Sequence, residues 1–372
     1  SDSWPIYISL QKDGILFKMR RTQDLPDKES ATMFFQDCKL ARQAQITGIS
    51  HSIKEILPPD LLDLTQLQKE ANIRYGYTAS EVYDIAQSLY EKKLISYPRT
   101  SSRYLTEDVF DSLSPIMARL LSWELFPAAK GTGGIDISSL SRHVISAEKA
   151  NVHHAIIITG IRPGNLSEKE MQVYRLVAGR MLEVFMAPCR IETTNVEAVC
   201  AAQHFKAEQT RIIEAGWHDV FMHSDMVPKS GYSVNELPEV KKGDNLNVCG
   251  CNMVHKKELP VDPFTDAELV EYMELNGLGT VSSRTNIIRT LVNRKYIRYS
   301  GKYIVPTPKG IFTYETIRGK KIADTSLTAD WEKQLAGLES GMITGQDFLN
   351  RIRTLAKEMT DDIFNTYSTK EE

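Results

Sequence analysis

Tyr97 and Arg99 lie two positions apart in the segment of residues 94–105 and combine a hydroxyl nucleophile with a permanent positive charge. A free phenol is a weak nucleophile at neutral pH because it is almost fully protonated. A guanidinium beside it would stabilise the phenolate and would bind two oxygens of a phosphate group at once. This pair of residue types therefore predicts chemistry at a phosphate ester, with Tyr97 as the attacking group.

The neighbouring residues predict how this pair is held. Thr78 and Glu81 have the spacing of a capping box, and apolar residues recur at helical spacing after them, so a helix is expected to run toward Tyr97. Pro98 disfavours the helical conformation for Tyr97, so the segment that follows should be extended. Residues two apart in an extended chain share one face. The phenol and the guanidinium of Arg99 should therefore reach the same ligand.

The composition is that of an ordinary globular protein. The chain has 372 residues, of which 42% are hydrophobic and 25% charged, and its net charge is −3, so we expect about two to three domains and no global polycation. No apolar run approaches the roughly 18 residues of a membrane span, and the first residues lack a signal-peptide pattern. No membrane partner is therefore expected. Five scattered cysteines favour a reducing compartment over a disulfide framework.

A local basic surface is nevertheless present in the last third of the chain. Residues 284–321 contain ten Lys or Arg residues and one acid, Glu315, whereas acids crowd residues 262–274 and the residues from 324 onwards. The predicted elements there are two helices joined by a tight turn and then two short strands, over residues 266–275, 276–280, 283–293, 296–299 and 303–305. This order is that of a winged-helix-like unit, a common nucleic-acid-binding shape. The charge and the pattern together predict contacts with phosphates.

The order of the predicted elements gives a multidomain α+β fold. We predict a discontinuous β-rich domain of residues 1–55 and 190–255, an inserted helical domain of residues 56–189 that bears Tyr97, and a mainly helical, winged-helix-like domain of residues 256–372. The first domain should open with a hairpin across Asp13 and Gly14. A helix is expected over residues 29–45, with Phe34, Phe35 and Leu40 as core candidates. The glycine-rich residues 130–134 are interpreted as a linker, because they lack the ending of a phosphate-binding loop.

A set of motifs that spans nearly the whole chain carries a family resemblance. The motifs are Leu-Pro-Pro at 57–59 with Leu-Thr-Gln-Leu-Gln at 64–68, Leu-Ile-Ser-Tyr-Pro-Arg-Thr at 94–100, His-His-Ala-Ile at 153–156, Asn-Gly-Leu-Gly-Thr at 276–280 with Arg284, and Leu-Thr-Ala-Asp-Trp-Glu at 327–332. In this order they resemble the type IA DNA topoisomerases, and the topoisomerase III branch more than the topoisomerase I branch. The resemblance implies that the β-rich domain is an arch or hinge, that the helical domain is a gate, and that the last domain grips DNA.

The resemblance also implies roles for three side chains. Tyr97 matches the nucleophile that attacks a phosphodiester of one DNA strand and becomes a 5′-phosphotyrosine. The covalent link keeps the energy of the broken bond, so resealing after strand passage needs no ATP. Arg99 matches the arginine that stabilises the scissile phosphate. His153 matches the histidine of the family's His-x-Ala-Ile segment, which contacts the region of that phosphate.

The resemblance also implies that other residues bind single-stranded DNA. Thr280 and Arg284 match positions of the DNA-gripping domain, Arg289 belongs to the basic surface beside them, and Thr65 and Gln68 are expected to seat the catalytic helices. The DNA-binding candidates are therefore Thr280, Arg284, Arg289, Thr65 and Gln68. The chain departs from the family pattern at Ser101, where an aspartate is usual, and this substitution puts the charge balance around Arg99 in doubt.

The N-terminal Toprim domain of the family has no counterpart in residues 1–60. In the family, that domain carries the acids that bind Mg²⁺ and the acid that serves the leaving oxygen. We therefore expect this chain to be a fragment that binds no metal itself, that needs Mg²⁺ held elsewhere in the full-length enzyme, and that is inactive alone. The resemblance further implies a cytoplasmic, nucleoid-associated enzyme with single-stranded DNA and a RecQ-type helicase as partners.

Two other classes of protein remain possible from the residues. A winged-helix DNA-binding protein without chemistry would use Tyr97 in ordinary packing. A different tyrosine-using nuclease or recombinase would surround the tyrosine with arginines and histidines and would leave a 3′-linked adduct. A covalent DNA adduct that is lost in Tyr97→Phe, once the missing domain is restored, would exclude the first class, and a 3′-linked adduct would favour the second.

Overall fold

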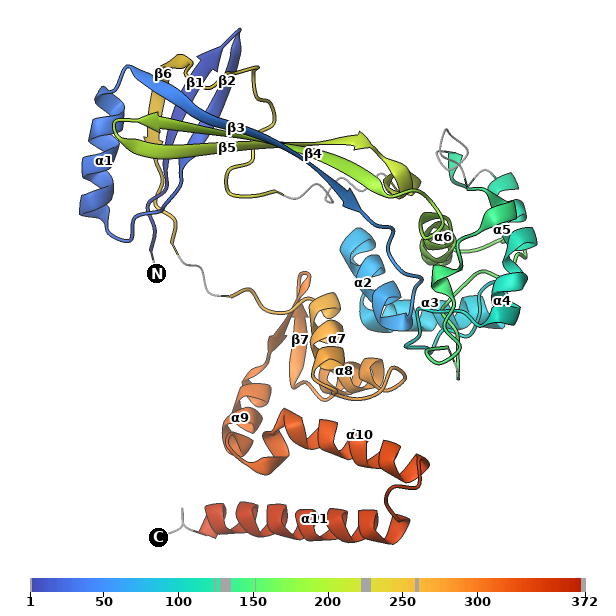
Figure 1. Cartoon of the computed structure of the whole chain (residues 1–372). Helices are drawn as coiled ribbons and strands as arrows, with labels where there is room; N and C mark the ends of the chain where they lie inside the picture. Colours follow the sequence, from blue (N-terminus) through green and yellow to red (C-terminus); the bar gives the residue numbers. More distant parts are fainter. Residues whose placement is uncertain are drawn as a thin grey trace. The chain divides into compact units, whose positions relative to one another are not determined.

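The computed structural model describes residues 2–123, 125–127, 135–150, 152–221, 229–257 and 261–368. These residues form two compact units built from interleaved parts of the chain (Figure 1). The first unit comprises Ser1–Pro59, Phe126–Ile135 and Leu182–Asp262, and the second comprises Asp60–Leu125, Asp136–Met181 and Pro263–Glu372. The linker predicted at residues 130–134 lies outside the described residues.

The first unit is a closed barrel of six strands in the order β1-β2-β5-β4-β3-β6 (Figure 1). The strands are β1 (Ile6–Lys12), β2 (Ile15–Arg21), β3 (Gln43–Ile56), β4 (Cys189–Cys200), β5 (Gln203–Glu214) and β6 (Asn245–Met253). All neighbouring strands pair antiparallel. Strands from the beginning of the chain thus pair with strands from far later in it; Ile6, for example, pairs with Met253 and Arg20 with Lys206.

Alternation along β1 shows why these residues form the wall of a barrel. Ile6, Ile8 and Leu10 are completely buried, while the residues between them face outward in part. The hairpin predicted between β1 and β2 is confirmed, since Asp13 and Gly14 both have positive φ angles, of 51° and 82°. Such angles match the right-handed twist of the two strands that the turn joins.

Helix α1 (Lys28–Leu40) packs on the barrel through Cys38 and Ala31, and Phe34 and Phe35 are partly buried against it. The expectation of a helix to residue 45 was wrong, because Ala41 is already extended and β3 begins at Gln43. Leu40 was also wrong as a core candidate, since its side chain is 80% exposed. Pairing with β4 and β6 overrides the helical pattern of these last residues.

The second unit is mainly helical and carries all the predicted site residues. Its elements are α2 (Leu64–Tyr75), α3 (Ala79–Glu91), α4 (Glu107–Asp111), α5 (Leu113–Ser122), α6 (Glu168–Glu183, whose last two residues count with the first unit), α7 (Asp266–Leu275), α8 (Arg284–Asn293), β7 (Ile297–Ser300), β8 (Tyr303–Pro306), α9 (Pro308–Ile317), α10 (Thr325–Glu339) and α11 (Gly345–Ser368). The prediction of a mixed α+β fold is confirmed by the barrel and this helical unit. None of the described helices has the length and apolar character that crossing a membrane requires.

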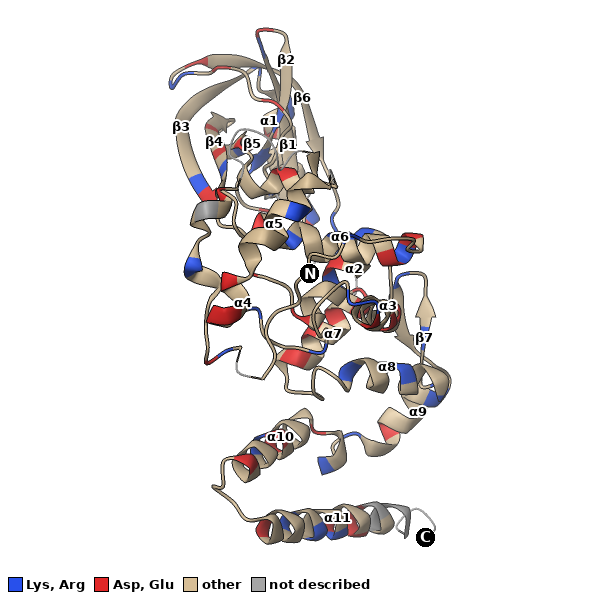
Figure 2. Ribbon diagram, turned by 90° about the vertical axis from the view of Figure 1, so that its right-hand side faces the viewer, with Lys and Arg blue, Asp and Glu red and all other residues tan. Residues whose placement is uncertain are grey.

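Helix α7, helix α8 and the two-stranded sheet β7–β8 pack together and against α3. Ala79, Val270, Met273 and Ile288 form a buried apolar cluster that joins α3 to α7 and α8. The charges of this region are segregated along the chain, with acids on α7 and mainly basic residues from α8 to Lys321 (Figure 2). The second unit therefore brings the basic segment close to the helix that leads to Tyr97.

Candidate active site

Helix α3 leads directly into the segment of Tyr97. The predicted capping box is confirmed: the backbone N–H of Glu81 donates to the Thr78 hydroxyl at 3.2 Å, and the Thr78 N–H donates to the Glu81 carboxylate at 2.9 Å. Two residues after the end of the helix, Lys93 is in the left-handed region at φ 58°. This residue turns the chain, so that Leu94 starts a new, extended direction toward Tyr97.

The extended residues 94–96 pair antiparallel with residues 157–159. The Ser96 N–H donates to the carbonyl of Ile157 at 2.8 Å, and the Thr159 N–H donates to the carbonyl of Leu94 at 3.1 Å. Four residues after Ser96, the buried hydroxyl of Thr100 donates to the carbonyl of His153 at 3.2 Å. These bonds fix the segment of Tyr97 alongside the segment of His153.

The side chains of Tyr97 and His153 are in ring contact as a result. Their ring centroids lie 4.6 Å apart with the planes tilted by 43°. Tyr97 is half-buried, and His153 is exposed. The neighbouring His154, to which the sequence assigns no role, lies with Nδ1 2.7 Å from the carbonyl of Ala155. Tyr97 therefore has one face against an imidazole that solvent and ligands can reach.

One face of α3 holds both Arg99 and Tyr97. Tyr83, Gln87 and Tyr90 follow one another at intervals of four and three residues, so they share this face. The guanidinium carbon of Arg99 lies 5.0 Å from the Tyr83 ring centroid, and Nη2 of Arg99 donates to Oε1 of Gln87 at 3.3 Å. The ring of Tyr90 meets Tyr97 edge-on, with centroids 5.4 Å apart and planes at 78°. The structure thus adds three supporting residues that the sequence analysis missed.

Arg99 retains an unused hydrogen-bond donor in this arrangement. Among the described residues its Nε is buried and has no hydrogen-bond partner. A buried donor without a partner costs free energy, and a phosphate oxygen would satisfy it. Arg99 is therefore held in a fixed orientation by Tyr83 and Gln87, and one of its N–H groups has no partner among the described residues.

Asp63 fixes the far end of the same segment. Its carboxylate, 1% exposed, caps α2 by accepting from the N–H of Gln66 at 2.7 Å and forms an ion pair with Nε of Arg103 at 2.7 Å. The N–H of Leu64 donates to the carbonyl of Thr100 at 3.1 Å. Burial alone would lower the pKa of Arg103, but the hydrogen bond and charge of Asp63 raise it. The arginine therefore stays charged and ties the tyrosine segment to α2.

Two of the DNA-binding candidates lie inside the second unit. Thr65 is 2% and Gln68 3% exposed. The amide of Gln68 donates to the hydroxyl of Thr285 on α8 and to the carbonyl of Ala79 on α3, both at 2.9 Å. Gln68 therefore joins α2, α3 and α8, which places it among the contacts that seat these helices.

The other three candidates lie on or just before α8. Thr280 is exposed, and its carbonyl accepts from the N–H groups of Ser283 and Arg284 in the first turn of the helix. Arg284 is 8% exposed, with Nη1 3.6 Å from the carboxylate of Glu274. Arg289 donates to the Ser80 hydroxyl at 2.9 Å and forms an ion pair with Asp84 at 2.8 Å, both on α3. Thr280 thus faces solvent, while both arginines hold protein partners.

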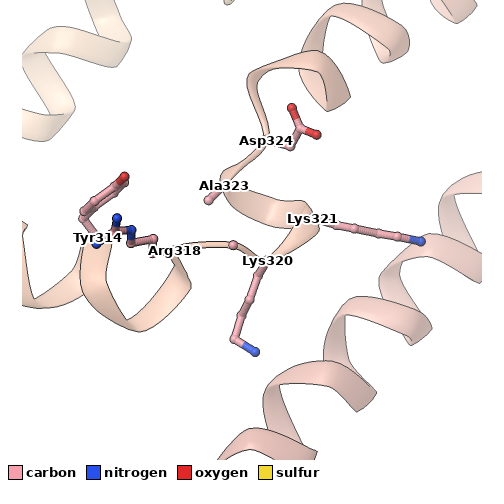
Figure 3. Close-up of a pocket in the computed structure, with 7 residues that line it drawn as sticks. Tyr314, Arg318, Lys320, Lys321, Ala323 and Asp324 are labelled. Atoms are coloured by element: carbon pink, nitrogen blue, oxygen red, sulfur yellow. The ribbon is translucent and has the colours of Figure 1, made fainter.

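A pocket of about 340 Å³ lies at the end of the basic segment (Figure 3). It is lined by Tyr314, Arg318, Lys320, Lys321 and Asp324 among others. Each cation has an acidic partner, since Arg318 pairs with Glu315, Lys320 with Asp362 and Lys321 with Glu358. Charge neutralisation within the protein therefore makes this pocket a weaker candidate for an anion than the residues around Arg99.

The family resemblance implies Mg²⁺, and the donor set of the chain can be tested for it. Among the described residues, no group of three or more His, Cys, Asp or Glu side chains lies together in a way that could hold a metal ion. Mg²⁺ prefers several oxygen ligands, including one or two carboxylates. The described residues therefore do not fit a magnesium site.

Comparison with known proteins identifies the family. A sequence model of the DNA topoisomerase family matches residues 1–350. DNA topoisomerase 3 of Bacillus licheniformis is 31% identical over 346 residues, which cover 87% of this chain and 47% of that protein. DNA topoisomerase 1 of Methanocaldococcus jannaschii is 29% identical over 367 residues, which cover 98% of this chain and 46% of that protein. The chain spans about half the length of the curated relatives that it matches.

A solved structure supports the fold independently. The full-length topoisomerase I from Thermotoga maritima superposes with a TM-score of 0.72 at 21% identity, and the match covers 96% of this chain and 59% of that chain. At this identity the likeness shows the fold alone. Together with the family match and the relatives named DNA topoisomerase 3, it means that the chain belongs to the type IA DNA topoisomerase family, on the topoisomerase III branch.

Proposed function

We propose that this chain supplies the nucleophile of a type IA DNA topoisomerase. Tyr97 cleaves one DNA strand, another strand passes through the break, and the break is resealed without ATP. The observation that carries the proposal is the arrangement of Tyr97 against His153, next to an Arg99 that two α3 side chains hold with one N–H unused. Ordinary packing of a tyrosine requires neither the arginine clamp nor the exposed imidazole.

The reaction is a transfer of one phosphoester to another. The Tyr97 oxygen attacks the phosphorus, the bond from phosphorus to the 3′ oxygen breaks, and the 5′ phosphate stays on the tyrosine. The phenol loses one proton, and the leaving 3′ oxygen gains one. Religation runs the same steps backwards, with the 3′ hydroxyl as nucleophile. The number of phosphoester bonds is unchanged, so no external energy source is needed.

Arg99 and His153 act on the phosphate in this proposal. The guanidinium of Arg99 binds a non-bridging oxygen, and its charge stabilises the negative charge that grows in the transition state. His153, whose ring contacts that of Tyr97, contacts the same phosphate. Tyr90 contacts the ring edge and limits its rotation. The phenol is thereby held in one orientation before the DNA arrives.

The DNA-binding candidates form the approach to this site. We propose that Thr280, Arg284 and Arg289 grip single-stranded DNA, while Thr65 and Gln68 seat α2 against α8. Exposure of Thr280 at the start of α8 supports a contact between that helix terminus and a phosphate. Mg²⁺ and the acid that protonates the leaving oxygen are proposed to come from a Toprim domain outside this chain. The chain alone should therefore cleave DNA poorly.

The finer architecture belongs to the same proposal. Residues 1–55 with 190–255 act as a β-rich arch, residues 56–189 as the gate that carries Tyr97, and residues 256–372 as a DNA-binding domain with a winged-helix-like arrangement of α7, α8, β7 and β8. The barrel assembled from separate stretches supports the first assignment. We further propose a cytoplasmic, nucleoid-associated site of action and a RecQ-type helicase as partner, both by family analogy.

The test is a covalent adduct in a protein that joins this chain to a Toprim domain. With single-stranded oligonucleotide and Mg²⁺, that protein should form a denaturation-resistant DNA adduct, and Tyr97→Phe should abolish it. Tyr90→Phe is the matched control, because it changes a neighbouring phenol on the same face and should keep the adduct. An adduct that survives Tyr97→Phe, or a protein that binds DNA without any adduct, would favour the non-catalytic winged-helix alternative or another nucleophile.

A further inference from the structure

Four charged side chains meet where α2, α7, α8 and the tyrosine segment pack together. Asp63 and Arg103 form one ion pair at 2.7 Å, and Glu274 and Arg284 form a second at 3.6 Å. Asp63 comes from the start of α2, Arg103 from the segment after Tyr97, Glu274 from α7 and Arg284 from α8. The cluster therefore connects the predicted DNA-gripping helix with the catalytic segment.

The two pairs differ in quality. The Asp63–Arg103 pair has hydrogen-bond length, and Asp63 has a second donor in the N–H of Gln66. The Glu274–Arg284 pair is longer than a hydrogen bond, and the buried Nη1 of Arg284 has no hydrogen-bond partner among the described residues. Arg284 is more than nine-tenths buried, so this missing bond is costly. Glu274 therefore neutralises the charge of Arg284 but leaves its Nη1 donor without a hydrogen bond.

The groups around Glu274 have opposing effects on the pKa of its carboxyl. Burial raises the pKa of the Glu274 carboxyl, and the negative charge of Asp63 raises it further, whereas Arg284, Arg103 and the hydroxyl of Thr65 oppose the rise. The side chain of Glu274 is 27% exposed, and that of Arg103 is 34% exposed, so the cluster reaches the surface at these two residues. An anion that arrives from solvent would meet Arg103 and Glu274 first.

We propose that Glu274 is an internal substitute for a DNA phosphate, which occupies Arg284 until a phosphodiester of single-stranded DNA displaces it. This inference rests on the proposed function and adds a residue that controls how strongly the DNA-binding surface holds its ligand. A phosphate oxygen makes the hydrogen bond to Nη1 that the carboxylate leaves unmade. Arg103 and Arg284 then share the phosphate, and the Glu274 side chain turns away from it.

Displacement has a consequence for protons. Once Arg284 turns to the phosphate, two anions, Asp63 and the phosphate, lie near the Glu274 carboxylate. Its remaining favourable contacts are the Thr65 hydroxyl and Arg103, whose charge it then shares with the phosphate. Its carboxylate then takes up one proton from the solvent, because two neighbouring negative charges disfavour the ionised form. Binding of single-stranded DNA should therefore be coupled to proton uptake and should weaken as the pH rises.

The experiment measures binding of a single-stranded oligonucleotide to the 372-residue chain at fixed salt, from pH 6 to pH 8. Isothermal titration calorimetry in two buffers of different ionisation enthalpy gives the number of protons taken up. The variant is Glu274→Gln, and the matched control is Glu271→Gln, which removes the same charge from the same helix. Glu271 pairs with Lys69 and lies outside the cluster.

Glu274→Gln should bind the oligonucleotide roughly fivefold or more tightly than the wild-type chain at pH 8, and its binding should lose the proton uptake. Glu271→Gln should stay within about twofold of the wild type and should keep the uptake. Equal effects of the two variants, or no proton uptake by the wild-type chain, would overturn the proposal. The proton uptake is measured on the wild-type chain, so this part of the test does not depend on whether a variant folds. If the protein with unmutated Tyr97 forms no DNA adduct, the proposed function is refuted, but the expected proton uptake and the effect of Glu274→Gln are unchanged.

Discussion

Replacing Asp63 tests whether the tyrosine segment is held by a buried charge. Asp63→Ala removes the cap of α2, which is worth about 1 kcal/mol. It also leaves Arg103 without its partner. Loss of one member of a fully buried pair costs about 3–5 kcal/mol, and we reduce this to about 1–2 kcal/mol because the Arg103 side chain is 34% exposed. The expected total is about 2–3 kcal/mol in the free energy of local opening.

Hydrogen exchange read by mass spectrometry is the assay, because it reports local opening of a single segment in a two-unit chain. Peptides that cover residues 64–75 and 97–105 should exchange roughly 30- to 150-fold faster in Asp63→Ala than in the wild type. Asp63→Asn should have about half of this effect in free energy, since asparagine caps a helix as well as aspartate but leaves Arg103 unpaired.

The matched control is Asp27→Ala. Asp27 caps α1 in the same way, by accepting from the N–H of Ser30 at 2.7 Å, and has no ion pair among the described residues. Its replacement should cost about 1 kcal/mol in the exchange of α1. If Asp63→Ala costs no more than Asp27→Ala, the ion pair with Arg103 contributes nothing, and the reasoning about the held segment is refuted.

Three further predictions concern other contacts of the chain. Tyr83→Leu removes the aromatic face under Arg99. Adduct formation should therefore slow by about three- to fivefold, while oligonucleotide affinity stays within about twofold. An unchanged rate would show that the ring does not hold the guanidinium. The ion pair with Lys92 and the hydrogen bonds from the Ser167 N–H and the Ser88 hydroxyl lower the pKa of Glu170 to about 2. Its contribution to the α3–α6 contact is therefore present above about pH 4.5 and lost as the pH falls toward 2. The difference in melting temperature between the wild type and Glu170→Gln should accordingly shrink from pH 6 to pH 3, and a constant difference would contradict the assignment. Gly310→Ala would place a Cβ against the carbonyl oxygen of Tyr296 and should destabilise the α9–β7 junction by about 2 kcal/mol, measured by hydrogen exchange. Gly301→Ala is the control, because Gly301 has φ 59° and no atom within 4 Å of its added Cβ, and it should cost about 1 kcal/mol. Equal costs of the two variants would refute the close approach at Gly310.

Local signals in the sequence were sufficient for much of the fold. The capping box of Thr78 and Glu81 and the hairpin turn at Asp13 and Gly14 are confirmed, because each depends on side chains and backbone angles within a few residues. Leu40 fails for the complementary reason. Its helical pattern continues past the point where pairing of β3 with distant strands takes over the chain.

The supporting shell of the site was harder to foresee. The spacing of Tyr83, Gln87 and Tyr90 on the helix that leads to Tyr97 is visible in the sequence, so this face was accessible to prediction. The contact of Asp63 and Arg103 with Glu274 and Arg284 was not, because it depends on the packing of α2 against helices some 200 residues later. Sequence motifs located the predicted reactive residues, whereas the charges that surround them follow from tertiary packing.

The polarity of the covalent link shows whether Tyr97 attacks DNA as a type IA topoisomerase nucleophile. A protein that joins this chain to a Toprim domain is incubated with Mg²⁺ and a single-stranded oligonucleotide labelled at either its 3′ or its 5′ end, and the labelled peptide is mapped. We expect the 3′ label to stay on the peptide that contains Tyr97 and the 5′ label to be released. A retained 5′ label, or a label on any other residue, would contradict this expectation.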